Sequence, residues 1–532
     1  MKNNVNIQRR QLLKFAGAGV AATAALTTFP GLLSAKAMRV SGQPSLEFNP
    51  DVEISLTEEV KYVPIFNGPQ TRVWKVLGKV LKGEQSVITN DDKSYLAPTI
   101  RLHKGQKVRI YLKNKLPSAT ILHWHGLHVP SKMDGNPMYA IANGETYVYE
   151  FEILNRAGTY WYHAHTHGLT AKHVYSGLAG LFIVSDDEEQ ALKLPDGEFD
   201  VPVVIQDRNF DQQNQLQYSN HMMQRMHGFL GDQIMINGRP DFELPVATRA
   251  YRMRLLNGSN SRIYKLAWDD GTPMKVIATD GGLLERAETL PYLMLAPAER
   301  REIWVDFSDK QIGTELTLRS LEFSSGGMGM MGGGMGGRGM MGGVGGGELA
   351  SGSDFSVLKV RVSKKASSND VLPKQLSQIK ALRLADAENP QSPRRITLSM
   401  RHMSALLNGR SYKMNDIRED EIFPVNTLQL MEFDNGFHGM GGMGMMGMPH
   451  PMHLHGEQFQ VVKREVKSKS GRGYSSVSEG FLDKGWKDTV LVMPGEKVTI
   501  LKPFNDFTGL FMYHCHNLEH EDMGMMRDLL VK

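Results

Sequence analysis

Apolar and polar residues alternate in several short stretches of the chain, and turn residues separate these stretches. Residues 99–112 alternate around a Lys-Gly turn, and residues 488–501 repeat that design around a Pro-Gly turn. Residues 248–256 alternate before a turn at Asn257-Gly258. A period of two is typical of strands that bury one face, and we interpret the first two stretches as β-hairpins. Long helical periods are rare, so the pattern predicts an all-β protein built of stacked β-sandwiches.

An internal repeat relates the beginning of the chain to its end. Residues 158–165 (GTYWYHAH) align with residues 509–516 (GLFMYHCH), and HWHG at 123–126 aligns with HLHG at 453–456. The repeat predicts two copies of one domain, with a spacer domain that lacks these histidines between them. A length of 532 residues allows about three domains. We therefore predict domains at 38–190, 195–363 and 394–532, with a polar, proline-containing linker at 364–393.

The first 37 residues have the composition of a targeting segment. Gln8-Arg9-Arg10-Gln11 resembles the twin-arginine export motif, an apolar stretch follows, and Ala35-Lys36-Ala37 fits a cleavage site. We expect export to the periplasm by the twin-arginine pathway; an uncleaved membrane anchor is the alternative. Without this segment, 56 basic residues stand against 57 acidic ones, a net charge of −1 instead of +4. That balance gives no reason to expect a nucleic-acid partner or membrane insertion after cleavage, and we expect a monomer.

Four His-x-His pairs stand at matched places of the repeat: His123/His125, His163/His165, His453/His455 and His514/His516. On a strand, residues i and i+2 point to one face. Eight converging imidazoles would repel one another if protonated, so neutral, metal-bound imidazoles are the better interpretation.

The only cysteine of the chain, Cys515, lies between His514 and His516, and strand geometry directs its sulfur to the opposite face. His450, His520 and Met525 are near it in the sequence. Two histidines, one cysteine and a more distant methionine are the ligand set of a blue-copper electron-transfer site. Structural zinc sites use more thiolates, which argues against zinc.

His-Pro-Met-His-Leu-His-Gly at 450–456 and His-Cys-His-x3-His-x4-Met at 514–525, together with the two first-domain pairs, closely resemble the motifs of the multicopper oxidases. The resemblance is closest to bacterial copper-efflux (CueO-like) and laccase-like oxidases. It implies three cupredoxin-like Greek-key domains and four copper ions per chain. The type 1 copper ligands implied are His450, Cys515, His520 and Met525. The type 2 ligands implied are His123 and His453. The type 3 ligands implied are His125, His163, His165, His455, His514 and His516.

The resemblance also implies the reaction: one-electron oxidation of a substrate, coupled to four-electron reduction of dioxygen to water. Proton delivery needs acids near the cluster. By resemblance Glu521, beside His520, is the expected donor, and Asp134 is expected to tune the type 2 side.

Two Met/Gly-rich patches suggest the electron donor. Residues 326–347 and 436–448 together hold 11 of the 32 methionines. Thioether sulfur prefers Cu(I), so we interpret both patches as mobile loops that handle cuprous ions, with Met446 and Met448 beside the type 1 site. Copper-efflux oxidases usually carry such an insertion elsewhere, ahead of an Asn-Gly like Asn408-Gly409. The stretch from His221 to His227 (HMMQRMH) and His438 also combine copper-binding residue types.

Three functions remain open at this point. The first is oxidation of Cu(I) for copper tolerance. The second is laccase-like oxidation of phenols, Mn(II) or Fe(II). The third is a non-catalytic periplasmic copper-binding protein, which would not need a cluster of eight histidines.

Overall fold

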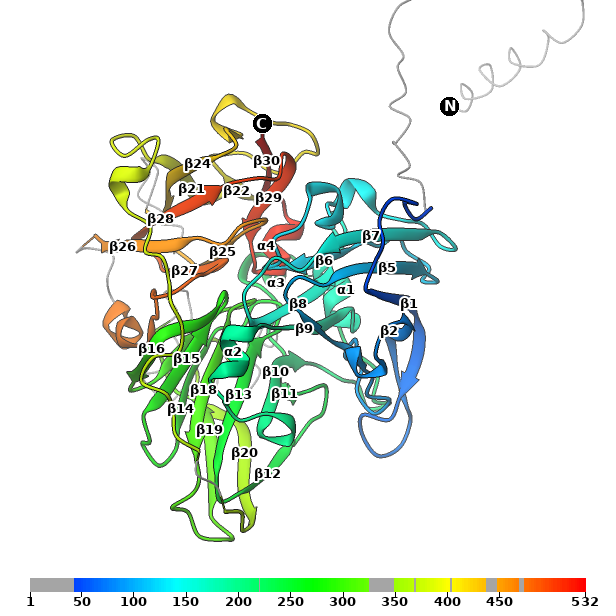
Figure 1. Cartoon of the computed structure of the whole chain (residues 1–532), viewed down its shortest axis with the longest axis vertical. Coiled ribbons are helices and arrows are strands. Elements are labelled where there is room, and N and C mark those ends of the chain that lie inside the picture. Colours follow the sequence, from blue (N-terminus) through cyan, green and yellow to red (C-terminus); the bar gives the residue numbers. More distant parts are fainter. Residues whose placement is uncertain are drawn as a thin grey trace, which may run out of the picture. The chain divides into compact units, whose positions relative to one another are not determined.

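The computed structural model describes residues 43–219, 221–324, 349–367, 370–401, 404–436, 447–467 and 473–532. The predicted signal peptide and nearly all of both Met/Gly patches, Met446 and His438 included, lie outside these residues. Within them, strands dominate and form six sheets, which confirms the all-β prediction (Figure 1). Among the described residues, no helix has the length and apolar character needed to span a bilayer.

The first sandwich, coloured blue to cyan in Figure 1, pairs a four-stranded sheet with a five-stranded one. The first sheet has the order β2 (Thr71–Lys82), β1 (Val52–Val63), β5 (Lys107–Asn114), β7 (Thr146–Glu152). The second has the order β3 (Ile88–Thr89), β4 (Thr99–His103), β9 (Ala179–Ser185), β8 (Gly158–Ala164), β6 (Leu122–His125). Apolar side chains of both sheets, Ile110 and Trp124 among them, fill the space between.

The second sandwich, mostly green, repeats this plan with eleven strands. One sheet has the order β11 (Gln233–Ile236), β10 (Asp200–Arg208), β13 (Ala250–Asn257), β18 (Arg300–Asp306), β15 (Met274–Thr279), β16 (Gly282–Leu290). The other has the order β12 (Glu243–Ala247), β20 (Phe355–Lys364), β19 (Glu315–Ser320), β14 (Tyr264–Trp268), β17 (Leu293–Leu295). The strand β13 ends at Asn257, where the sequence predicts a turn.

The third sandwich runs from yellow to red in Figure 1. One sheet has the order β22 (Ser404–Leu407), β21 (Arg394–Arg401), β24 (Thr427–Asp434), β28 (Glu496–Phe504), β26 (Gln460–Val466). The other has the order β23 (Ile422–Phe423), β30 (Met526–Val531), β29 (Gly509–Cys515), β25 (His450–Leu454), β27 (Thr489–Val492). The exact domain and linker boundaries stay a prediction.

Strand pairing shows that all three sandwiches share one topology. In each, an early strand pairs in parallel with a later one: β1 with β5, β10 with β13 and β21 with β24. The facing sheets contain the same kind of parallel pair: β4 with β9, β12 with β20 and β23 with β30. The second sandwich therefore repeats the plan of the other two, although its sequence lacks their histidine pairs.

The hairpin interpretation of residues 99–112 and 488–501 is wrong. Each stretch contains two strands, but β4 and β5 belong to different sheets, and so do β27 and β28. The turn glycines Gly105 and Gly495 have φ of 88° and 75°, and they carry the chain from one sheet to the other. Periodicity detects a strand but not its partner, because alternation is the same in a hairpin and in an arch between facing sheets.

Helices are short and lie in the connections. The α-helices of the described residues are α1 (Thr170–Ser176), α2 (Asp187–Ala191), α3 (Met222–His227) and α4 (Leu518–Asp522). Short 3₁₀ helices cover Gln85–Val87, Ser131–Met133, Pro137–Tyr139, Gly197–Phe199, Leu384–Asp386, Glu419–Glu421, Tyr474–Ser476 and Ser478–Gly480. The side chain of Asn517 caps α4 by accepting a hydrogen bond from the His520 amide.

A buried ionic network joins the first sandwich to the second. Glu302 accepts hydrogen bonds from Arg252 at 2.7 Å, from Arg254 at 2.8 Å and from the Thr159 hydroxyl at 2.7 Å. Burial raises the pKa of Glu302, but the charges of Arg252 and Arg254 outweigh burial and hold the pKa below its ordinary value. The carboxylate is therefore ionised and fully paired.

We predict that Glu302→Gln destabilises the protein by about 3 to 5 kcal/mol, because it leaves two buried arginines short of negative charge. Denaturant unfolding measures this, with Glu198→Gln, whose side chain is 64% exposed, as the control. Because the pKa of Glu302 in the folded protein is depressed, Glu302 stabilises the fold at pH values above the ordinary glutamate pKa. This stabilisation is lost as the pH falls below that ordinary value. If the free energy of unfolding differed between wild type and variant by the same amount throughout the acid range, this account would be contradicted.

Candidate metal centres

Two pairs of adjacent strands position the eight histidines of the His-x-His motifs. In the first sandwich β6 pairs with β8 so that His123 lies opposite His163. In the third, β25 pairs with β29 so that His453 lies opposite His514. All eight side chains are buried, with at most 2% of any residue exposed. The strands thus bring together at their ends the histidines that the sequence predicts to converge.

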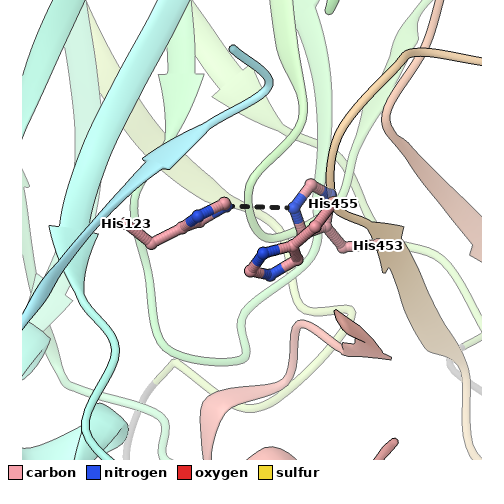
Figure 2. A group of neighbouring side chains, drawn as sticks. All are labelled: His123, His453 and His455. Carbon is pink, nitrogen blue, oxygen red and sulfur yellow. Dashed lines mark hydrogen bonds between the residues drawn. The ribbon is translucent and has the colours of Figure 1, made fainter. Parts of the chain in front are cut away.

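Histidine ring nitrogens of the first and third sandwiches face each other. The Nε2 atoms of His123 and His453 are 3.4 Å apart, and Figure 2 shows His123 pointing toward His453 and His455. The Nε2 atoms of His163 and His516, and those of His165 and His514, are also 3.4 Å apart. Two imidazoles bound to one ion at about 2.0–2.1 Å each would hold their nitrogens at a similar separation.

Burial lowers the pKa of six of the histidines well below the ordinary value, and neighbouring positive groups lower it further. These are His125, His163, His165, His453, His455 and His516. Neutral imidazoles carry a free lone pair, which is what a metal ligand needs. The arrangement fits bound metal ions and fits poorly with protonated side chains.

Partners on the outer side fix which nitrogen of each ring points inward. Backbone carbonyls lie against Nδ1 of four rings, which leaves Nε2 for the metal. These contacts join His123 to Asp134 (2.6 Å), His453 to Asp488 (2.8 Å), His163 to Ala164 (2.9 Å) and His514 to Cys515 (3.2 Å).

The ring of His125 has the opposite orientation, with Nε2 on its outer side. The residue that holds it there, Asp488, was not identified from the sequence. Nε2 of His125 lies 3.0 Å from the carboxylate of Asp488, and Nδ1 of His125 is buried without a hydrogen-bond partner. Asp488 is itself held by Arg300 of the second sandwich through contacts of 2.5 and 2.8 Å. Residues 488–501 carry no signal beyond strand alternation. Only the pairing of His453 with Thr489 brings Asp488 to the cluster.

The structure places both Asp134 and Glu521 at the histidine cluster. The Asp134 carboxylate is 2.7 Å from Nδ1 of His455 and 3.4 Å from Nδ1 of His123. Burial raises the pKa of Asp134, against the opposing charge of His123. The Glu521 carboxylate lies 3.1 Å from Nδ1 of His514 and 3.7 Å from Nε2 of His165, without a well-aligned hydrogen bond. Asp134 thus lies against the rings of His455 and His123, and Glu521 lies beside those of His514 and His165.

A second cluster surrounds Cys515 on the other face of β29. The cysteine sulfur lies 3.5 Å from Nδ1 of His450 and 3.7 Å from Nδ1 of His520, and all three are buried. Met525 is also buried, and its carbonyl accepts a hydrogen bond from the Cys515 amide. Burial raises the pKa of the Cys515 thiol, so a metal ion that binds sulfur must displace its proton. His450, Cys515 and His520 thus lie together, and Met525 belongs to the same apolar cluster as Cys515.

The substrate-copper residues are less defined. Met446 lies outside the described residues. Met448, two residues before His450, is half-buried, and its carbonyl accepts a hydrogen bond from the Asn435 side chain. The site of Met448 beside the type 1 ligands stays a prediction. His103, His128 and His173 have partners away from both clusters.

Comparison with known proteins identifies the family. Multicopper oxidase family models match residues 73–189 and 388–532. The chain is 32% identical to "Multicopper oxidase mco" of Staphylococcus aureus over 450 residues, 85% of each chain. It is 28% identical to a laccase of Bacillus subtilis, covering 81% of this chain and 88% of that one. The protein belongs to the multicopper oxidases, a family whose members bind copper, which the two clusters fit.

A solved structure agrees with this assignment. The fold matches the multicopper oxidase from Campylobacter jejuni, described as a metallo-oxidase, with a TM-score of 0.70 and 26% identity. The match covers 92% of this chain and 95% of that one. The three cupredoxin-like sandwiches are therefore confirmed.

We predict that Asp488→Asn weakens copper retention by about 10- to 100-fold, the range typical of a lost partner of a metal-bound histidine. The amide can no longer accept a charge-assisted hydrogen bond from His125 while pairing with Arg300. Copper content after titration with a chelator measures the effect. The control is Asp506→Asn, since Asp506 is about half-exposed and contacts His128 instead. Equal copper retention in both variants would refute the positioning role.

Proposed function

We propose that this protein is a cuprous oxidase that transfers electrons from Cu(I) to dioxygen, forming water, and so serves copper tolerance. The observation that carries the proposal is the junction at the end of β29. Cys515 belongs to one ligand cluster, and its covalent neighbours His514 and His516 belong to the other.

In this proposal the chain holds four copper ions. The type 1 ligands are His450, Cys515, His520 and Met525. The type 2 ligands are His123 and His453. The type 3 ligands are His125, His163, His165, His455, His514 and His516. When bound, copper supplies one-electron oxidation of the substrate and the four-electron reduction of dioxygen.

The residues of the chain connect the two clusters, orient the histidine rings and supply protons. The backbone from Cys515 to His514 and His516 gives electrons a short bonded path between the clusters. Glu521, with its oxygens 3.1 Å from His514 and 3.7 Å from His165, holds and delivers protons at the dioxygen site. Asp134 and Asp488 fix the rings of His455 and His125.

Two further features support Cu(I) as the substrate. The chain concentrates methionines in residues 326–347 and 436–448, and thioethers favour Cu(I). His520 is fully buried, so its imidazole presents no open edge to an organic molecule. A twin-arginine signal at residues 1–37 would deliver the folded protein to the periplasm, where copper tolerance is needed.

Laccase-like oxidation of phenols, Mn(II) or Fe(II) is the alternative, and the similarity to the laccase of Bacillus subtilis favours it. A copper-binding protein without catalysis is the weaker candidate, because storage requires neither the eight-histidine cluster nor its connection to Cys515.

We predict that the copper-loaded protein takes up one dioxygen for every four Cu(I) oxidised, and that Cys515→Ser abolishes uptake by removing the sulfur ligand. An oxygen electrode with Cu(I) as sole reductant measures this. Turnover of a phenol without turnover of Cu(I) would favour the laccase alternative. No turnover of either would leave the copper-binding role.

We predict that Glu521→Gln lowers kcat by about 10²- to 10⁴-fold, the usual contribution of a general acid. Copper content and type 1 absorption should stay unchanged, since Glu521 is not a ligand. The matched control is Glu457→Gln, whose carboxylate bonds Asn505 instead of a cluster histidine. A kcat equal to that of wild type would exclude Glu521 as the proton donor.

A further inference from the structure

A chain of aromatic side chains runs through the core of the first sandwich, starting at strand β6. Trp124 lies between the two histidines of this strand. Its ring centroid is 5.0 Å from that of Tyr149, which is 4.7 Å from that of Tyr147. The ring of Tyr147 is in turn 6.1 Å from that of Tyr139. These separations are typical of aromatic pairs in contact, so the chain is continuous.

The two ends of this chain have different surroundings. Trp124 is 0% exposed, and it is covalently joined to two histidines whose rings belong to the buried cluster. Tyr149 and Tyr147 are also buried, whereas Tyr139 is partly exposed. The chain therefore leads from the histidine cluster to solvent.

The internal repeat shows that Trp124 is particular to the first sandwich. In the aligned motifs HWHG and HLHG, Leu454 of the third sandwich takes the place of Trp124. In the aligned motifs HAH and HCH, Ala164 of the first sandwich takes the place of Cys515. Each of these two sandwiches thus has one oxidisable side chain between two cluster histidines, on the opposite face of the strand. Cys515 connects the cluster to a second set of metal ligands, and Trp124 connects it to the tyrosines.

Hydrogen bonds of the buried phenols determine where the chain can lose a proton. The Tyr149 hydroxyl donates to the Leu122 carbonyl at 2.8 Å. The Tyr147 hydroxyl donates to the Lys132 carbonyl at 2.5 Å. A carbonyl is too weak a base to take a phenolic proton, and burial raises the pKa of both tyrosines. An oxidised phenol can therefore release its proton to water at Tyr139, which reaches solvent, but not at the two buried positions.

We propose that four aromatic side chains form a second route for electrons between the surface and the histidine cluster: Trp124, Tyr149, Tyr147 and Tyr139. When the substrate has supplied dioxygen with fewer than four electrons, Trp124 gives up the missing electron and regains one from Tyr149. The deficit passes outward from ring to ring until Tyr139 has lost one electron, and its phenolic proton leaves to water.

The resulting tyrosyl radical is restored by a small reductant in solution, which gives up one electron and one proton. In total, dioxygen gains one electron and the reductant loses one, while the proton released at Tyr139 replaces the one consumed at the cluster. The route would protect the cluster histidines from oxidation. It goes beyond the proposed cuprous oxidase function, because it operates with any substrate that reduces the protein.

The test uses the copper-loaded protein, reduced with fewer than four electron equivalents of dithionite per chain and then mixed with dioxygen. Electron paramagnetic resonance of freeze-quenched samples detects a tyrosyl radical, and ring-deuterated tyrosine narrows its signal and so assigns it. Tyr139→Phe removes the surface end of the route and Tyr147→Phe its middle, since phenylalanine keeps the ring but is much harder to oxidise. Tyr62→Phe is the matched control, because Tyr62 is 62% exposed and lies outside the route.

We expect a tyrosyl radical in wild type and in Tyr62→Phe, and its loss in Tyr139→Phe and Tyr147→Phe at unchanged copper content. After repeated cycles with limiting reductant, peptide mass spectrometry should find more oxidised histidine and tryptophan in β6 and β8 of these two variants than of wild type. A tyrosyl radical of undiminished intensity in both variants would overturn the route. So would the absence of a tyrosyl radical in wild type.

Discussion

The protein depends on one arrangement that is unfavourable by itself: eight imidazoles, buried and facing one another across two sandwiches. When neither of two facing ring nitrogens carries a hydrogen, they cannot form a hydrogen bond. Nitrogens 3.2 to 3.4 Å apart then gain no stability from their proximity. Strand ladders keep them in place, because His123 and His163 sit opposite on one pair of strands, as His453 and His514 do on another. The cost of burying their polar atoms is recovered only when metal ions bind.

The second sandwich stabilises this arrangement although it supplies none of the histidines. Arg300 extends from β18 to pair with Asp488. Burial lowers the pKa of Arg300, but the charge of Asp488 outweighs burial and raises that pKa above its ordinary value, so the arginine stays charged. Asp488 in turn fixes the orientation of His125. The domain that the sequence presents as a spacer thus contributes to the geometry of a site between its neighbours.

Sequence reasoning was most successful where chemistry is encoded locally. The four His-x-His pairs and Cys515 could be identified because their spacing carries the meaning, whereas Glu521 was named only by resemblance to the family, and the all-β class followed from alternation. It failed for the arches at residues 99–112 and 488–501, since alternation does not reveal which sheet a strand joins. It also missed Asp488 and Arg300, which are 188 residues apart and meet only through tertiary structure. The position of α3 against His520 was equally invisible, because no local pattern relates Met226 to a residue 294 positions later.

The buried state of the single cysteine has a consequence for how the molecule matures. Cys515 is 0% exposed, and the chain has no second thiol with which it could form an internal disulfide. The fold is therefore complete without thiol oxidation, and neither glutathione nor a disulfide-forming enzyme shifts its stability. The same conformation can form in a reducing compartment and persist in an oxidising one, which removes redox environment as a constraint on where in the cell the chain first folds.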